Sequence, residues 1–272
     1  MKIGLMISLR HGSDMDEKFR NAAELELSAC QVSCYEVELY TKENAERIIT
    51  AAKKYGILIT ALWAGWSGPQ EWNFYAGPET LGIVPKAYRF TRMKELLMAS
   101  DFAELLGVTD IITHVGFLPE NPNDPDYTGT VAAIRNLALY MKKKKQYFLF
   151  ETGQETPTTL VRTIEDVGTD NLGVNFDTGN LVMYGKANPV DALDILGKYV
   201  RNVHCKDGVY PVCGKNLGKE VTIGTGKVDF PRIIEKLKAL NYTGPLIIER
   251  EHAGDKKIQD IILARDILRS LI

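Results

Sequence analysis

The 272-residue sequence lacks the features that mark a secreted, membrane-spanning or nucleic-acid-binding protein. Its formal net charge is −2, so no excess of basic residues favours nucleic acid or an anionic membrane surface. No apolar run approaches the roughly 18 residues that a membrane span needs. A signal peptide is not expected either, because the N-terminal apolar run is short and no small-residue cleavage site follows it. We therefore expect a cytoplasmic protein with no nucleic-acid or membrane partner.

Cysteine and nucleotide-binding motifs are also scarce. The four cysteines, at positions 30, 34, 205 and 213, show no CxxC spacing and are expected to be reduced thiols. Cys30 and Cys34 are expected in or near the core and not on zinc, since no second Cys or His pair accompanies them. A GxGxxG turn after the first strand and a P-loop are both missing, which removes support for a nucleotide-binding sheet.

What the sequence does contain is a regular alternation of strand-like and helix-like segments. Strands are predicted at residues 3–8, 32–39, 57–63, 110–114, 147–151, 172–177, 200–205 and 245–249. Helices are predicted at residues 16–30, 42–54, 88–106, 130–144, 158–167, 189–196, 231–240 and over the C-terminal segment. With no linker or low-complexity segment, this pattern predicts a closed (β/α)8 TIM barrel that forms a single domain over residues 1–272. An open doubly wound sheet is the alternative.

Four predicted strands end in a residue that can bind a metal ion. Glu151, Asp177, His204 and Glu249 end the fifth to eighth strands, whose C-terminal ends share one face of a parallel barrel. Oxygen ligands with a single imidazole suit one divalent metal ion, such as Mn, Mg, Co or Zn. A single acidic residue at a strand end is as readily a helix cap or an ion-pair partner. Four such residues at the ends of four adjacent strands predict a metal site. His114 ends the fourth strand and is predicted to contact substrate. The alternative is that it belongs to the barrel wall and makes its hydrogen bonds within the protein.

This ligand set predicts a type of chemistry. A divalent metal bound to two oxygens of a hydroxy-ketone acidifies the carbon between them and stabilises the enediolate. Glu151 and Glu249 come from strands that flank such a substrate, so they are the predicted acid/base pair. Return of the proton to the opposite face gives epimerisation, whereas return to the neighbouring carbon gives aldose–ketose isomerisation.

The motifs FETGQE, NFDTGN, HCKDG, GTGKVDF and LIIERE resemble those of the xylose isomerase-like TIM barrel superfamily, which includes the ketose 3-epimerases. The resemblance covers nearly the whole chain and implies that Glu151, Asp177, His204 and Glu249 hold one metal ion. It implies that the two glutamates are also the acid/base pair. A homo-dimer or homo-tetramer is a further expectation from the family.

The same resemblance implies several contacts to a small carbohydrate substrate. Lys206 and Asp207 match the HxKD turn, and Glu155 matches a second glutamate that contacts substrate. Many members have a substrate-contacting histidine where this chain has Asn180. That departure weakens the transfer of any particular epimerase specificity. The endonuclease branch is disfavoured, because its multi-zinc site needs many more histidines than four.

Aromatic residues cluster after the third predicted strand, where a long loop carries Trp63, Trp66 and Trp72 in or beside it. We predict that Trp63 and Trp66 contact the apolar face of a sugar, while packing of the loop onto the barrel rim is the alternative. The leading hypothesis is a metal-dependent epimerase or isomerase of a sugar or sugar phosphate. A lyase or dehydratase that uses the same metal site, and a non-catalytic sugar-binding barrel, remain as alternatives.

Overall fold

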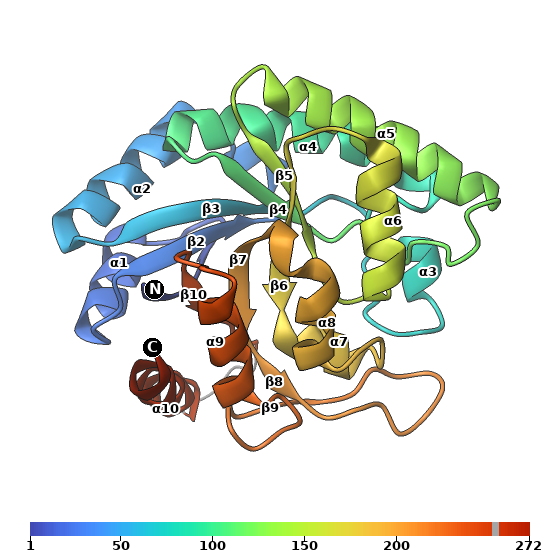
Figure 1. The fold of residues 1–272 in the computed structure, drawn as a ribbon. Coiled ribbons are helices and arrows are strands. Elements are labelled where there is room, and N and C mark those ends of the chain that lie inside the picture. Colours follow the sequence, from blue (N-terminus) through green and yellow to red (C-terminus); the bar gives the residue numbers. More distant parts are fainter. Residues whose placement is uncertain (252–255) are drawn as a thin grey trace.

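Eight parallel strands close into a barrel in the computed structural model, which describes residues 1–251 and 256–272 (Figure 1). The strands lie in the order β1-β10-β7-β6-β5-β4-β3-β2 around the barrel. Their bounds are β1 (Ile3–Leu9), β2 (Ala29–Cys34), β3 (Leu58–Ala64), β4 (Asp110–Thr113), β5 (Tyr147–Glu151), β6 (Leu172–Asp177), β7 (Val200–Cys205) and β10 (Leu246–Ile248). The predicted (β/α)8 TIM barrel is therefore confirmed.

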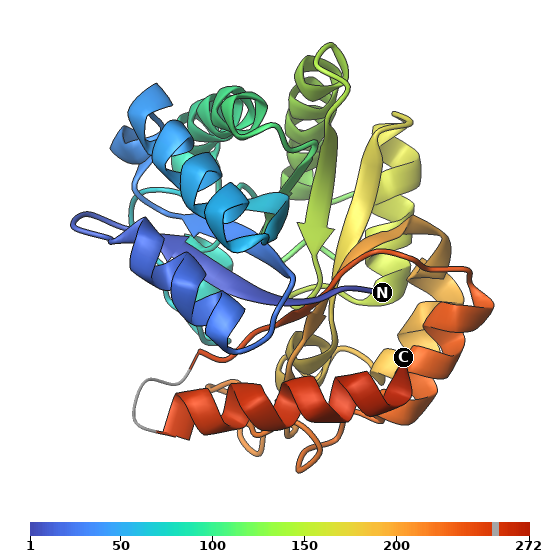
Figure 2. The same cartoon turned by 90° about the vertical axis from the view of Figure 1, so that its left-hand side faces the viewer.

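Helices surround the barrel, and α10 lies along its outside next to α9, β1 and β10 (Figure 2). The helices are α1 (Met15–Glu24), α2 (Lys42–Tyr55), α3 (Gly77–Thr80), α4 (Lys86–Leu106), α5 (Pro125–Lys142), α6 (Pro157–Val167), α7 (Thr178–Met183), α8 (Pro189–Leu196), α9 (Phe230–Ala239) and α10 (Lys256–Leu271), with short 3-10 turns η1 (Val37–Leu39) and η2 (Gly197–Tyr199). The helix ends follow local chemistry: the Thr41 side chain caps α2, and left-handed Gly107 ends α4.

The first βα unit differs from its prediction. Helix α1 ends at Glu24 and not at residue 30, because Glu26 adopts a left-handed conformation with φ of 55° and Leu27 donates its N–H back to Ala22. Strand β2 then begins at Ala29 and ends at Cys34, whereas residues 32–39 were predicted. All of its residues are buried, but Gln31 and Ser33 break the apolar run that would mark such a strand in the sequence.

Helix α5 also begins earlier than predicted, at Pro125 and not at residue 130. The carboxylate of Asp124 accepts the N–H of Asp126, and Pro125 occupies the first turn, where its missing N–H costs nothing. Helix α7 and the two-stranded antiparallel pair β8 (Asp207–Gly208) and β9 (Glu220–Val221) were not predicted. These elements lie at the same end of the barrel as the polar strand ends.

Strand alternation decides which side chains face the barrel interior. Phe148 and Phe150 of β5 pack into the main core between barrel and helices, whereas Leu149 packs in a separate cluster with Ile112 and Trp63. Glu151 shares the face of Leu149, so it points inward at the end of the strand. The polar strand ends therefore meet inside the mouth of the barrel.

The predicted core positions of Cys30 and Cys34 are confirmed. All four are free, and Cys30 and Cys34 are buried, as is Cys205, while Cys213 is exposed. None of the helices within residues 1–251 and 256–272 combines the length and the apolarity needed to cross a membrane.

Candidate metal centre and active site

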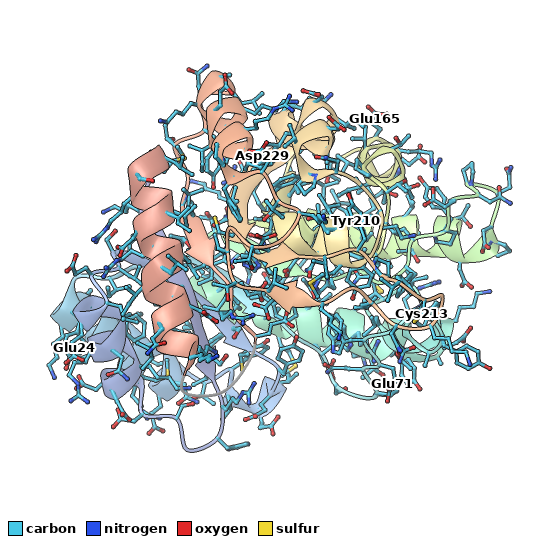
Figure 3. All side chains as sticks on the ribbon, turned by 90° about the horizontal axis from the view of Figure 1, so that it is seen from below. Glu24, Glu71, Glu165, Tyr210, Cys213 and Asp229 are labelled. Atoms are coloured by element: carbon cyan, nitrogen blue, oxygen red, sulfur yellow. The ribbon has the colours of Figure 1, made fainter. Side chains whose placement is uncertain are left out.

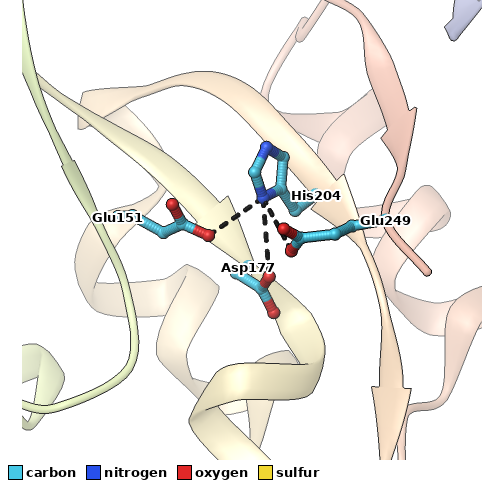
Figure 4. Close-up of side chains that lie close together, drawn as sticks. All are labelled: Glu151, Asp177, His204 and Glu249. Atoms are coloured by element: carbon cyan, nitrogen blue, oxygen red, sulfur yellow. Dashed lines mark hydrogen bonds and ion pairs between the residues drawn. The ribbon is translucent and has the colours of Figure 1, made fainter. Parts of the chain in front are cut away.

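The four predicted ligands converge at the C-terminal end of the barrel (Figure 4). Glu151 ends β5, Asp177 ends β6, His204 is the next-to-last residue of β7, and Glu249 directly follows β10. His204 Nδ1 lies 3.0 Å from Glu151 Oε1, 3.1 Å from Glu249 Oε2 and 3.5 Å from Asp177 Oδ2. All four ligand atoms lie within 4.8 Å of one another.

This arrangement fits a divalent cation. Three carboxylates and one imidazole offer one atom each, and three of the four residues are fully buried. Asp177 Oδ1 accepts the N–H of Asn180 at 2.6 Å and so begins α7, whereas its Oδ2 accepts no hydrogen bond from the described residues. Buried carboxylates this close repel one another unless a positive charge lies between them. The cluster could therefore hold a hard or intermediate divalent ion.

In the metal-free protein, protons and nearby cations balance part of this charge. Burial raises the pKa of Asp177 to about 7, against the opposing charge of Lys206. Burial also acts on Glu249, but Lys206 and His204 outweigh it and hold the pKa of Glu249 well below its ordinary value. The carboxylates of Glu249 and Glu151 overcome burial at His204 and raise its pKa well above the usual range. A metal ion would replace the proton on His204 with a larger charge.

Lys206 lies directly beside the ligands although it is 1% exposed. Its Nζ lies 2.9 Å from Glu249 Oε2 and 2.6 Å from Glu251 Oε1, and it donates to Asn180 Oδ1 at 3.1 Å. Burial opposes the charge, but Asp177 and Glu249 raise the pKa of Lys206 well above its ordinary value. The structure thus brings Lys206 and Asn180, both predicted to contact substrate, together beside the candidate metal centre.

A cavity of about 330 Å³ opens above the cluster. Its wall includes Glu151, Glu249, His114, Asn180, Trp63, Trp72, Tyr35, Tyr184 and Glu251. The volume lies at the lower end of the range for small-molecule sites. Of the predicted substrate contacts, His114, Asn180 and Trp63 line this cavity, whereas Glu155, Lys206 and Trp66 do not reach its surface.

Residues 19–271 match the family model described as xylose isomerase-like TIM barrel. The chain belongs to this family. A solved structure of a xylose isomerase domain protein from Planctomyces limnophilus is 34% identical, with a TM-score of 0.92, and the match covers 99% of this chain and 96% of that chain. The 3-keto-D-glucoside 4-epimerase from E. coli shares the fold, at 18% identity and a TM-score of 0.75 over 99% of both chains.

Curated relatives match over a shorter stretch. An uncharacterised protein from Methanocaldococcus jannaschii is 31% identical over 121 residues, which is 43% of this chain and 37% of the relative. Inosose dehydratase from Geobacillus thermodenitrificans is 29% identical over 115 residues, which is 37% of each chain. The chain therefore matches about a third of the length of these relatives. The proteins that resemble this chain thus include an epimerase and a dehydratase.

Two cavity residues hold Glu151 in place in this family member. Trp63 Nε1 donates a hydrogen bond to Glu151 Oε2, and His114 Nε2 lies 3.8 Å from the same oxygen. Burial lowers the pKa of His114, which favours its neutral form. The His114 ring also packs edge-on against Trp63 and Trp72, with centroid distances of 5.9 and 5.4 Å. One oxygen of Glu151 thus faces the metal cluster and the other faces the cavity wall.

Trp66 lies behind this wall. Its ring is 1% exposed, and the Arg92 guanidinium lies over it at 5.3 Å from the ring centroid. The buried Arg92 donates to the backbone carbonyls of Ser67, Pro69, Thr80 and Gly82, so it fixes the loop that carries the tryptophans. Trp72, which is 39% exposed, has the position at the cavity that was predicted for Trp66.

Glu155 is buried near the cavity without lining it. Its side chain is 1% exposed, and neither carboxylate oxygen has a hydrogen-bond partner among the described residues. Burial raises its pKa to about 8. This carboxyl group is therefore largely protonated at neutral pH.

The loop after β7 is built around Asp207. Its carboxylate accepts the backbone N–H groups of Gly208, Gly224, Gly226 and Val228 at 2.8 to 3.1 Å. A Cβ at Gly226 would overlap this carboxylate, and Gly224 has a φ of 87°, so both glycines of the GTG turn are required. The loop also contacts the tryptophan loop, because Phe74 donates its N–H to the Lys215 carbonyl. Figure 3 labels Cys213 and Glu71 on these two neighbouring loops.

Several site residues were not predicted. Tyr35 and Tyr184 line the cavity, and Glu251 binds Lys206 at its rim. Glu251 stands within the LIIERE motif, which was a usable signal. Gln31 contacts His204 from β2, and no local pattern in the sequence marks it.

Proposed function

We propose that this protein is a divalent-metal-dependent epimerase or isomerase of a sugar or sugar phosphate that acts through an enediolate, with Glu151 and Glu249 as its acid/base pair. The observation that carries the proposal is that both glutamates belong to the metal cluster and also line the cavity. When bound, the metal would supply Lewis-acid stabilisation of negative charge on substrate oxygens.

Residues of the protein position the two carboxylates that would transfer protons. Trp63 orients Glu151, and Lys206 orients Glu249, so each carboxylate has its own positioning partner, and the two lie on either side of His204 Nδ1 (Figure 4). If one carboxylate removes a carbon-bound proton and the other, as a carboxylic acid, donates its own proton to the opposite face, that carbon is inverted. Return to the adjacent carbon moves the carbonyl group instead. Which of the two outcomes follows depends on how the substrate is held.

Substrate positioning is assigned to the cavity wall. The rings of Tyr35, Trp63 and Trp72 offer apolar faces to a sugar. Asn180 Oδ1 accepts from Lys206, so its amide NH2 is the group free to donate to a substrate oxygen.

The oligomeric state, a homo-dimer or a homo-tetramer, stays a prediction. Light scattering would measure it.

A dehydratase that uses the same enediolate is the second candidate. It is favoured by the match to inosose dehydratase and by the ammonium of Lys206 beside the cavity. Loss of a hydroxyl group needs a proton donor, and the raised pKa of Lys206 makes it a weak one. Epimerisation or isomerisation is therefore the preferred candidate function. A non-catalytic sugar-binding barrel would have no need of a metal ion.

Deuterium exchange tests this proposal. The protein is loaded with Mg²⁺ or Mn²⁺ in deuterated water, and ketoses and keto-sugars, with and without phosphate, are followed by NMR after metal removal. Metal-dependent entry of deuterium next to the carbonyl, lost in Glu151→Gln and Glu249→Gln, is the expected result. Glu165→Gln, at an exposed position of α6 shown in Figure 3, is the matched control. A dehydrated product would favour the second candidate, and a metal-loaded protein that exchanges no substrate would refute the enzyme proposal.

A further inference from the structure

The barrel interior beneath the metal centre contains a chain of buried polar side chains. Gln31 of β2, Asn175 of β6, Asn202 of β7 and Asp110 of β4 are all 5% exposed or less. Gln31 Nε2 donates to Asn175 Oδ1 and Asn202 Oδ1, each at 3.2 Å. Asn202 Nδ2 donates to Asp110 Oδ2 at 2.9 Å. Buried polar groups are costly unless they are paired, so a continuous chain of them calls for an explanation.

The direction of these hydrogen bonds is set at one end by an ion pair. Arg201 Nε and one terminal nitrogen contact the Asp110 carboxylate at 3.0 to 3.2 Å. An ionised carboxylate only accepts hydrogen bonds, so Asn202 must turn its NH2 group towards Asp110. The Asn202 oxygen then faces Gln31, and Gln31 must donate to it. The Gln31 oxygen is consequently left to face the other way.

The Gln31 side-chain oxygen contacts His204 of the candidate metal centre. Gln31 Oε1 lies 2.7 Å from His204 Nε2, and an amide oxygen can only accept. His204 Nε2 must therefore carry a proton. In a neutral imidazole the other nitrogen then has a lone pair, and this is Nδ1, which faces Glu151, Asp177 and Glu249.

We propose that Asp110, Asn202 and Gln31 form a relay that fixes the tautomer of His204 and so makes Nδ1 a metal ligand. The inference rests on the metal-dependent function proposed above. Asp110 begins β4 and pairs with Tyr147, four residues before Glu151 on β5. At about 3.3 Å per residue, its backbone lies about 13 Å from the level of Glu151 along the strand direction. Asp110 is thus a positioning residue that touches neither metal nor substrate.

Asp110→Asn is the decisive variant, since it changes the polarity of the relay and hardly its shape. Arg201 only donates, so the introduced side-chain amide would turn its oxygen to Arg201 and its NH2 group to Asn202. Asn202 and Gln31 must then flip in turn. Asn175 can follow, because its Nδ2 has no partner among the described residues. A donor would now face His204 Nε2 and favour the wrong tautomer.

Two measurements detect the effect of Asp110→Asn on His204. Isothermal titration with MgCl2 and MnCl2 is expected to show metal affinity about 10- to 100-fold weaker in Asp110→Asn than in the wild type. NMR of protein with ¹⁵N-labelled histidine, loaded with Mg²⁺, is expected to show a protonated His204 Nε2 in the wild type and its loss in the variant. Assignment is practical because the chain has four histidines. Gln31→Leu, which removes the acceptor directly, is expected to weaken metal binding as well.

Ser100→Ala is the matched control. Ser100 makes a buried hydrogen bond of 2.6 Å to Gln146 outside the relay, so its loss lowers stability and leaves metal affinity unchanged. Wild-type affinity together with an unchanged Nε2 proton signal in folded Asp110→Asn would overturn the relay. A wild-type protein that bound no divalent metal would instead refute the proposed function. That outcome would overturn the relay as well, because its proposed role is to make Nδ1 a metal ligand. The two failures are distinguishable, since only a failure of the relay alone leaves metal binding by the wild type intact.

Discussion

Replacement of Glu155 by glutamine is expected to stabilise the protein at neutral and alkaline pH. The carboxyl group is buried without a hydrogen-bond partner among the described residues, and desolvation raises its pKa from 4.5 to about 8. The folded state therefore holds this proton more tightly than the unfolded chain does. The stability it contributes is fully present below pH 4.5 and is lost as the pH rises to about 8.

The magnitude follows from the two pKa values. One pKa unit corresponds to about 1.4 kcal/mol, so the difference between 4.5 and about 8 corresponds to about 5 kcal/mol at most. At pH 7 the wild type has lost about 3 kcal/mol of this. Glutamine has the shape of the protonated acid and cannot ionise. Glu155→Gln is thus expected to exceed the wild type in stability by about 1 kcal/mol or less at pH 5 and by increasing amounts from there to about pH 8.

Urea unfolding from pH 5 to pH 9, with chelator present so that metal binding does not contribute, measures this. The difference in unfolding free energy between Glu155→Gln and wild type cancels the titration of all other groups. Glu165→Gln at an exposed position serves as the control and is expected to show no such trend. A difference that stays constant across the pH range would refute the argument that Glu155 is buried and protonated.

Three further outcomes are expected. Glu249→Gln is expected to lower turnover by about 10² to 10⁴-fold in steady-state assays. Unchanged activity would remove Glu249 from the acid/base role. Asp207→Ala leaves four backbone N–H groups without their acceptor and is expected to cost about 3 kcal/mol or more in urea unfolding. An unchanged midpoint would contradict this. Trp72→Ala removes one aromatic wall of the cavity and is expected to raise KM about 3- to 10-fold with kcat retained. A fall in kcat alone would contradict a binding role.

The strands that carry the site were predictable because of how a parallel barrel buries them. Strands β5, β6 and β7 have the bounds predicted from the sequence. Both faces of such strands are covered, so each shows an apolar run that stops where the chain reaches the mouth of the barrel. Glu151, Asp177 and His204 are at those stops. Their convergence then follows from the shared direction of the strands.

The choice among the tryptophans was not predictable in the same way. Trp66 and Trp72 lie in one loop and are equivalent in the sequence, so only tertiary packing separates them. The buried guanidinium of Arg92 lies over Trp66 and holds it in the wall, which leaves Trp72 at the cavity. Arg92 comes from α4, where an arginine is normally expected on the solvent side.

The strand that was predicted in the wrong place shows where reasoning from the sequence reaches its limit. Strand β2 has the sequence ACQVSC, and its polar Gln31 interrupts the apolar run that would have marked it. Gln31 is buried there because it bonds to His204, which lies 173 residues away in the chain. The residue that interrupts the apolar pattern of the strand is therefore the one that contacts His204, the proposed metal ligand. Both facts follow from one cause, since a polar side chain inside a barrel is stable only where distant strands supply its partners.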